Sequence, residues 1–250
     1  MREDRTSEYW DEKWAFGDKP ERCVLDGSGG EEEFDREIRR RTIGKKVLDE
    51  GCGPGDFTLS IAKKARLVVG VDSSREALEQ ARRRLARSRI GEVEFRFADA
   101  IHLPFPDKSF DVVYSRRGPG SDSLRSLSEA FRVLREKGIF MEITIGERDK
   151  QNIARIFGRG QMFHVKGQVS DIKRRMLGKV GFREIVVRDY LGTEVFKGMK
   201  DLLVRLQSAP IIPRFNIQKD KKYLAKVGKE CMTDKGIGTP VHRVVLVCRK

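Results

Sequence analysis

Three glycines at alternate positions, Gly51, Gly53 and Gly55, follow a short apolar run that ends in the acidic residue Asp49. The residues after the glycines read as the start of a helix. This is the pattern of a strand that enters a glycine turn at a helix N-terminus, where the backbone can come close to a nucleotide-like ligand. A glycine turn alone does not fix the ligand, because dinucleotide-binding enzymes also use one.

Asp56 narrows the choice of ligand for this turn, because it occupies the position where a dinucleotide fingerprint has its third glycine. A carboxylate beside a helix N-terminus repels a pyrophosphate, and no Walker lysine follows the turn. The turn is therefore predicted to hold a ligand whose local charge is cationic.

Strands and helices alternate on both sides of this turn. Apolar runs predict seven strands, at residues 46–49, 66–71, 93–97, 110–114, 139–145, 182–188 and 241–247. Periodic apolar positions predict helices at 31–43, after a capping-box pattern at 73–76, and at 121–136 and 170–179. Such alternation favours an α/β fold, a mostly parallel Rossmann-like sheet with helices on both faces. Its ligands are expected at the C-terminal ends of the strands.

The chain is predicted to be a single domain over residues 1–250, with a cofactor-binding core at 31–190 and an N-terminal cap segment at 1–30. Tyr9, Trp10 and Trp14 in that segment either fold over the site or attach the first helix to the sheet. Residues 192–240, between the sixth and seventh strands, are predicted to form a lid or substrate-binding insertion, because long rim insertions commonly do so. Residues 146–169 form a second interruption of the pattern.

The composition is that of a soluble chain with a charged surface. The 52 Lys and Arg residues exceed the 38 Asp and Glu residues, which gives a formal charge of +14. This charge attracts anionic substrates or nucleic acid. The alternative is a solvated surface, because the basic runs fall within predicted helices and no basic strand interleaved with aromatic residues accompanies them.

No apolar run approaches the roughly 20 residues that span a bilayer, and the N-terminus lacks an apolar signal core, so a cytoplasmic location is expected. The four cysteines are scattered and are interpreted as reduced thiols: Cys23, Cys52, Cys231 and Cys248. No pattern of metal ligands is present, and no metal is predicted.

Taken in order, four segments of the chain resemble the motifs of class I S-adenosylmethionine-dependent methyltransferases. They are residues 47–55 (V-L-D-E-G-C-G-P-G), 68–74 (V-V-G-V-D-S-S) and the two motifs within 96–115 (R-F-A-D-A-I-H-L-P-F-P-D-K-S-F-D-V-V-Y-S). The resemblance covers about residues 31–190. It implies a seven-stranded sheet whose last strand is antiparallel, with S-adenosyl-L-methionine as cofactor and S-adenosyl-L-homocysteine as product.

The resemblance also implies cofactor contacts at nine positions, namely Asp49, Gly51, Cys52, Gly53, Asp72, Ser73, Asp99, Ala100 and Ser115. Asp49 is expected to face the cationic methionine end of the cofactor, where a carboxylate is favourable. Asp72 is expected to accept hydrogen bonds from both ribose hydroxyls. Asp99 and the Ala100 backbone are expected beside the adenine, and Ser115 near the methyl donor. Glu50 departs from the apolar residue common at its position.

Two acceptor classes are disfavoured by the residues after the fourth and fifth strands. The sequence Ser115-Arg116-Arg117-Gly118-Pro119 replaces the Asn/Asp-Pro-Pro-aromatic motif expected for methylation of an adenine amino group. No cysteine follows either strand, which argues against covalent catalysis at a pyrimidine carbon.

Candidate acceptor residues follow the fourth and fifth strands. Arg116, Arg117 and Arg159 are candidates for binding an acidic substrate, although surface arginines at helix ends are an equal alternative for the first two. Glu147, Asp149 and His164 are candidate general bases, with His164 in a loop of glycine and aromatic residues.

The predicted function is methyl transfer by in-line displacement to an unidentified small-molecule acceptor. An RNA methyltransferase that uses the basic surface is one alternative, and a non-catalytic S-adenosylmethionine-binding protein is another. The sequence predicts no membrane partner and does not indicate an oligomeric state.

Overall fold

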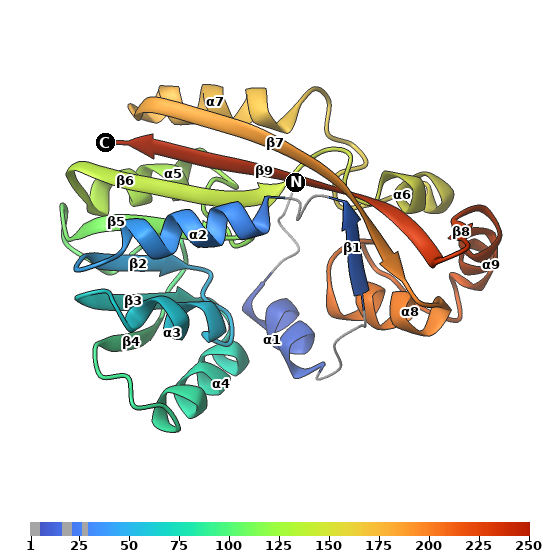
Figure 1. Cartoon of the computed structure of the whole chain (residues 1–250), viewed down its shortest axis with the longest axis horizontal. Coiled ribbons are helices and arrows are strands. Elements are labelled where there is room, and N and C mark those ends of the chain that lie inside the picture. The colour runs from blue at the N-terminus through green and yellow to red at the C-terminus, as the bar shows by residue number, and fades with distance from the viewer. Residues whose placement is uncertain (1–5, 17–21, 27–29) are drawn as a thin grey trace.

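The structure is a computed structural model and describes residues 6–16, 22–26 and 30–250, with only the backbone described for residues 22–26. Figure 1 shows the whole chain. The helices are α1 (Ser7–Ala15), α2 (Glu31–Arg41), α3 (Asp56–Ala62), α4 (Arg75–Ala86), α5 (Leu124–Val133), α6 (Gln151–Phe157), α7 (Val169–Val180), α8 (Met199–Ser208) and α9 (Lys221–Glu230). The strands are β1 (Arg22–Asp26), β2 (Lys46–Glu50), β3 (Leu67–Asp72), β4 (Val93–Phe97), β5 (Phe110–Arg116), β6 (Leu134–Ile145), β7 (Arg183–Phe196), β8 (Met232–Thr233) and β9 (Gly236–Arg249).

The described strands form one sheet in the order β1-β7-β9-β6-β5-β2-β3-β4, with β8 paired to β9. Strands β2 to β6 pair in parallel with one another, and β9 runs antiparallel between β6 and β7. The predicted α/β fold with an antiparallel last strand is therefore confirmed. Because the order reverses at β2, the C-terminal ends of β2, β3 and β5 meet at one edge, where such sheets bind ligands.

Two further strands extend the predicted seven. β1 pairs antiparallel with the end of β7, and β8 pairs with the start of β9. Both strands are short, and each pairs with a longer strand. Local periodicity does not predict such pairing.

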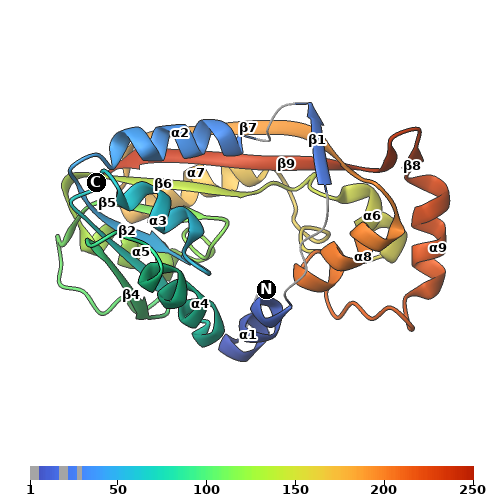
Figure 2. The same ribbon diagram turned by 60° about the horizontal axis from the view of Figure 1, so that its bottom comes forward.

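Helices cover both faces of the sheet (Figures 1 and 2). On one face, side chains of α2, α3 and α4 pack on the strands around Val47, Val68 and Tyr114. On the other, α5 and α7 pack around Leu48, Val113 and Phe140. Strand residues alternate between these two cores, as the period of a β-strand requires.

A third core lies beyond this sheet, where β7 and β9 continue as a paired ribbon. The two strands stay in register as far as Phe196 and Ile237, inside the predicted insertion of residues 192–240. Only residues 197–235 lie between the strands, and α8 and α9 from this segment pack with α6 around Phe157, Phe196 and Leu206. Whether this part acts as a lid stays a prediction.

Two local predictions were wrong. The helix predicted at 121–136 ends at Val133, because Leu134 already pairs with Phe110 of β5, and the register then shifts before Ile139. The capping box predicted at 73–76 is absent, because Ser74 itself is the N-cap of α4 and accepts a hydrogen bond from the Ala77 amide at 3.1 Å.

The cysteines with described side chains, Cys52, Cys231 and Cys248, are free thiols, and the side chain of Cys23 lies outside the described residues. Among the helices that the structure describes, none has the length and apolar character needed to cross a bilayer.

Candidate functional site

Asp49 lies at the end of β2 with 2% of its surface exposed. Its Oδ2 atom accepts hydrogen bonds from the Thr58 hydroxyl and the Tyr114 hydroxyl, both at 2.6 Å. Its Oδ1 atom is buried and has no hydrogen-bond partner within the described part of the chain. Burial raises the pKa of this carboxyl to about 6, against the opposing effect of the two hydroxyl donors. Since an unpartnered buried oxygen is costly, Oδ1 indicates a place for a donor supplied by a ligand.

The glycine turn that follows Asp49 is in close contact with two other segments. Gly51 and Gly53 have φ of 74° and 52°, in the left-handed region that favours glycine. A Cβ atom at Gly51 would lie 2.7 Å from Cδ of Pro119, and one at Gly53 would lie 2.9 Å from the ring of Trp14. The loop after β5 and helix α1 therefore both pack on the turn, and neither glycine can carry a side chain in this arrangement.

Asp72, at the end of β3, holds the same turn from the neighbouring strand. Its Oδ2 atom accepts a hydrogen bond from the Gly53 amide at 2.8 Å, and its Oδ1 atom accepts one from the Ser74 amide at 2.9 Å. Burial raises its pKa, while these backbone donors oppose the shift. Each carboxylate oxygen can accept a second hydrogen bond, so Asp72 can still bind hydroxyl groups of a ligand.

Helix α1 closes the outer side of this region and contacts both α4 and α8 (Figure 2). Asp11 accepts hydrogen bonds from the Ser74 hydroxyl at 2.5 Å and from the Glu76 amide at 3.0 Å. Trp14 joins the helix to α4 through its carbonyl, which accepts from Gln80 at 3.1 Å, while its ring lies on Gly53. The N-terminal aromatic residue Trp14 therefore covers the glycine turn.

The remaining strand-end residues named from the sequence also lie at this edge. Asp99 follows β4 and is exposed, with its Oδ1 atom accepting from the Ile101 amide at 3.1 Å, and Ala100 is buried beside it. The carbonyl of Ser73 accepts a hydrogen bond from the Ser7 hydroxyl. Cys52 is half-buried in the turn, and burial raises the pKa of its thiol well above the ordinary value.

A buried polar row under the loop after β5 was not predicted from the sequence. Glu50, Ser115 and Glu142 lie on the adjacent strands β2, β5 and β6 and are all fully buried. Ser115 donates to the Glu50 carbonyl at 2.9 Å, and Glu142 accepts from the Ser121 hydroxyl and from its amide at 3.3 Å. Neither side-chain oxygen of Glu50 has a hydrogen-bond partner among the residues described. The only signal in the sequence was an acid at a position where apolar residues are common.

This row leads to a prediction about stability. Burial, with added repulsion from Glu142 and Asp49, raises the pKa of Glu50 well above its ordinary value of 4.5. Above about pH 4.5 the unfolded protein loses the Glu50 proton while the folded protein keeps it. The free energy of unfolding is therefore highest below about pH 4.5 and falls as the pH rises toward the folded-state pKa. E50Q is expected to be more stable than wild type by about 1–3 kcal/mol near neutral pH, because it has no proton to lose on unfolding, whereas wild type loses up to about 1.4 kcal/mol for each pH unit above 4.5. The difference should shrink in acid.

Urea denaturation of both proteins across the pH range measures this difference. E92Q serves as the control, because Glu92 is exposed at the start of β4 and should change little. Equal destabilisation of E50Q at every pH would contradict the assignment of a neutral, unpartnered Glu50.

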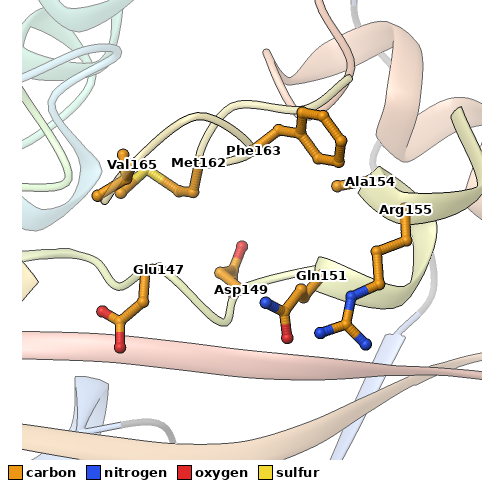
Figure 3. A pocket seen from close by; sticks show the side chains of 8 residues that line it. All are labelled: Glu147, Asp149, Gln151, Ala154, Arg155, Met162, Phe163 and Val165. Carbon is orange, nitrogen blue, oxygen red and sulfur yellow. The ribbon is translucent and has the colours of Figure 1, made fainter. Parts of the chain in front are cut away.

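A cavity of about 210 Å³ opens beyond the C-terminal end of β6. In Figure 3 the loop that carries Met162, Phe163 and Val165 faces residues 147–155 across it. The lining combines apolar, acidic, amide and basic side chains: Glu147, Asp149, Gln151, Ala154, Arg155, Met162, Phe163 and Val165. Its size and mixed lining suit part of a small organic molecule.

Comparison with known proteins identifies the family. Residues 42–177, more than half of the chain, match the family model described as a methyltransferase domain. The chain belongs to the methyltransferase domain family. Its sheet order and its four motifs are those of the class I S-adenosylmethionine-dependent members of that family.

Relatives of this methyltransferase agree with the assignment. It is 38% identical over 124 residues to a demethylmenaquinone methyltransferase of Symbiobacterium thermophilum, a match that covers 46% of the chain and 49% of the relative. The chain thus spans about half the length of the curated relatives it matches.

Solved structures share the fold. The YcgJ protein of Bacillus subtilis superposes with a TM-score of 0.66 at 18% identity, covering 88% of this chain and 98% of that one. The [4+2]-cyclase SpnF superposes with a TM-score of 0.63 at 19% identity, covering 98% and 97%. Because a protein described as a cyclase has this fold, the fold alone does not define the reaction.

The described residues of the methyltransferase fit the cofactor of its family, S-adenosylmethionine. The unpartnered Oδ1 atom of Asp49 suits the ammonium of the methionine end, and Asp72 has acceptor capacity left for ribose hydroxyls. Ser115, in contrast, has its hydroxyl engaged by the Glu50 carbonyl and the Gly120 amide, and lies under the loop after β5. Its predicted contact with the cofactor stays a prediction.

The candidate acceptor residues of the methyltransferase differ in their surroundings. Asp149 lines the cavity but is paired with Arg243 at 2.6 Å, and Glu147 accepts from the Val169 amide at 3.1 Å. His164 is exposed and its ring contacts Phe163, a residue of the cavity wall. Arg159 binds Asp220 through one nitrogen, at 2.7 and 2.8 Å, which fixes the end of α6 to the start of α9. Among the described His, Cys, Asp and Glu residues, no group could hold a metal ion.

Proposed function

We propose that this protein transfers the methyl group of S-adenosylmethionine to a small-molecule acceptor. The single observation that carries the proposal is the buried, unpartnered Oδ1 atom of Asp49, placed beside a glycine turn that matches the family's cofactor motif. The cofactor, when bound, supplies a methyl group already activated by its sulfonium. The chain itself needs mainly to position the two reactants and to exclude water.

Named residues divide these tasks. Asp49 orients the cationic end of the cofactor, Asp72 its ribose, and Asp99 with the Ala100 backbone its adenine. Trp14 and α1 shield the glycine turn from solvent. If the acceptor must lose a proton, Glu147 is the best-placed base of the three candidates. It lines the cavity, and its basic neighbours His242 and Arg148 are 3.7 and 3.9 Å away, whereas Asp149 is paired with Arg243 at 2.6 Å.

The acceptor is proposed to be a small organic molecule because the cavity beyond β6 is small and partly apolar. A relative named for demethylmenaquinone methylation supports the same class of acceptor. The net charge of +14 does not by itself favour RNA, because no basic strand interleaved with aromatic residues accompanies it in the sequence.

The test is transfer of a tritiated methyl group from S-adenosylmethionine into cell extract, which is then separated into RNA, protein and small molecules. Label in the small-molecule fraction is the expected result. Label in RNA, with binding that weakens steeply as salt rises, would establish the RNA alternative instead. Tight cofactor binding with no label in any fraction would establish a non-catalytic binding protein.

A further inference from the structure

Arg117 has an unusual position directly after β5. Its φ of 62° is in the left-handed region, which is strained for a residue with a side chain. Burial lowers the pKa of its guanidinium to about 10, with Arg116, Arg243 and Arg205 adding repulsion against the attraction of Glu31. Even so, 29% of the side chain remains accessible to solvent. A group that is surrounded by protein yet reachable by solvent lies in a concave part of the surface.

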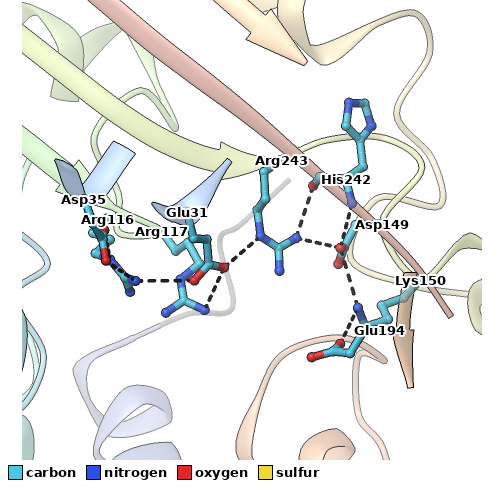
Figure 4. A network of polar contacts seen from close by, with 9 residues as sticks. All are labelled: Glu31, Asp35, Arg116, Arg117, Asp149, Lys150, Glu194, His242 and Arg243. Atoms are coloured by element: carbon cyan, nitrogen blue, oxygen red, sulfur yellow. Dashed lines mark hydrogen bonds and ion pairs between the residues drawn. The ribbon is translucent and has the colours of Figure 1, made fainter. Parts of the chain in front are cut away.

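Arg117 also makes weaker polar contacts than the nearby Arg116 and Arg243 (Figure 4). Arg116 is held by both oxygens of Asp35, at 2.8 and 3.1 Å, and Arg243 is held by Asp149 at 2.6 Å. Arg117 makes no hydrogen bond through its guanidinium to any described residue. Within the described ranges, its one ion pair is with Glu31, at 3.6 Å.

Glu31 does not fully neutralise the charge of Arg117, because three arginines share its single negative charge. Its carboxylate also contacts Arg243 at 3.2 Å and Arg116 at 3.3 Å, both closer than Arg117. The guanidinium of Arg117 therefore keeps most of its five donors for another acid group.

The surroundings of Arg117 place it on the acceptor side of the site. The charges that act on it are those of Glu31 on α2, Arg116 on β5, Arg243 on β9 and Arg205 on α8. Its ion-pair partner Glu31 does not bind Asp49, whose hydrogen-bond partners come from α3 and β5. In Figure 4, Glu31 joins Arg117 to Arg243, and Arg243 contacts Asp149, which lines the cavity beyond β6.

We propose that Arg117 binds an acid group, a carboxylate or a phosphate, of the methyl acceptor. The planar fork of arginine matches both groups with two parallel hydrogen bonds. This inference rests on the proposed function and narrows its substrate class to anionic small molecules. Of the three arginines named from the sequence, Arg116 and Arg159 already have close carboxylate partners, and Arg117 alone has the open donors.

The experiment compares wild type with R117Q, R117K and the control R125Q, since Arg125 is an exposed arginine on α5. Labelled small molecules from the transfer reaction are separated by anion exchange. We expect the label in the anionic pool, with kcat/KM lowered about 10- to 100-fold in R117Q, less in R117K, and unchanged in R125Q. Phosphatase treatment of that pool distinguishes a phosphate, whose product loses its retention, from a carboxylate, whose product keeps it.

The cofactor also carries a carboxylate that Arg117 could bind. Calorimetric titration of S-adenosylhomocysteine into the same variants shows whether Arg117 binds the cofactor or the acceptor. R117Q should bind the product as wild type does. A tenfold loss of this binding would assign Arg117 to the cofactor and overturn the proposal. Label only in neutral or cationic molecules, or equal kcat/KM for R117Q and R125Q, would also overturn it while leaving methyl transfer intact. Absence of label in every pool would instead contradict the proposed function itself.

Discussion

D49N is expected to weaken the binding of S-adenosylhomocysteine by about 10- to 150-fold near neutral pH. The change keeps the shape of the side chain, and its amide oxygen can still accept from Thr58 and Tyr114. It removes the negative charge that we propose to face the ammonium of the ligand. A hydrogen bond to a charged group contributes roughly 1.5–3 kcal/mol, which corresponds to this loss of affinity. Isothermal titration calorimetry measures it directly.

The pH dependence gives this prediction an independent check. Because burial raises the pKa of Asp49 to about 6, the carboxyl takes up a proton as the pH falls through that value. A cationic ligand favours the ionised form, so the affinity of wild type should fall by up to about tenfold for each unit below about pH 6. D49N should show no such dependence. The same slope in both proteins would mean that another group is responsible.

D72A is the second change with a large expected effect, again about 10- to 150-fold weaker binding of S-adenosylhomocysteine. Two causes contribute, because Asp72 is predicted to bind the ribose hydroxyls and also fixes the Gly53 and Ser74 amides. D72N separates them, since its amide oxygen keeps one backbone contact but the charge is lost.

D56A is the matched control, because Asp56 is a carboxylate at the same turn that faces solvent and pairs with Arg84 at 3.1 Å. It should bind S-adenosylhomocysteine nearly as wild type does. Wild-type affinity in D72A would remove Asp72 from the cofactor site, and a similar loss in D56A would show a general effect of charge at the turn.

The positions of the strand-end acids and of the glycine turn could be predicted from the sequence because their determinants are local. Asp49 and Asp72 each end an apolar run, and a parallel sheet brings the ends of adjacent strands to one edge. The glycines between them report a backbone conformation that other residues rarely adopt. These signals depend on neighbours in the chain, and so they need no knowledge of long-range packing.

The acceptor half depends on contacts between distant segments, which local patterns do not encode. Arg116 and Arg117 are adjacent in sequence, yet Asp35 of α2 binds the first and leaves the second open. The partner of Asp149 is Arg243, almost a hundred residues away on β9. Glu50 and Glu142 lie in one row only because β5 separates β2 from β6. In the same way, the pairing of Leu134 with Phe110 ends α5 earlier than its periodicity predicts.

A crystal structure of the protein with S-adenosylhomocysteine would test the central claim most directly. The account predicts the ligand on the glycine turn, with its ammonium within hydrogen-bond distance of Oδ1 of Asp49 and its ribose hydroxyls on Asp72. Trp14 should cover it. A ligand bound elsewhere, or one whose ammonium lies away from Asp49 while Oδ1 stays unpartnered, would contradict the account.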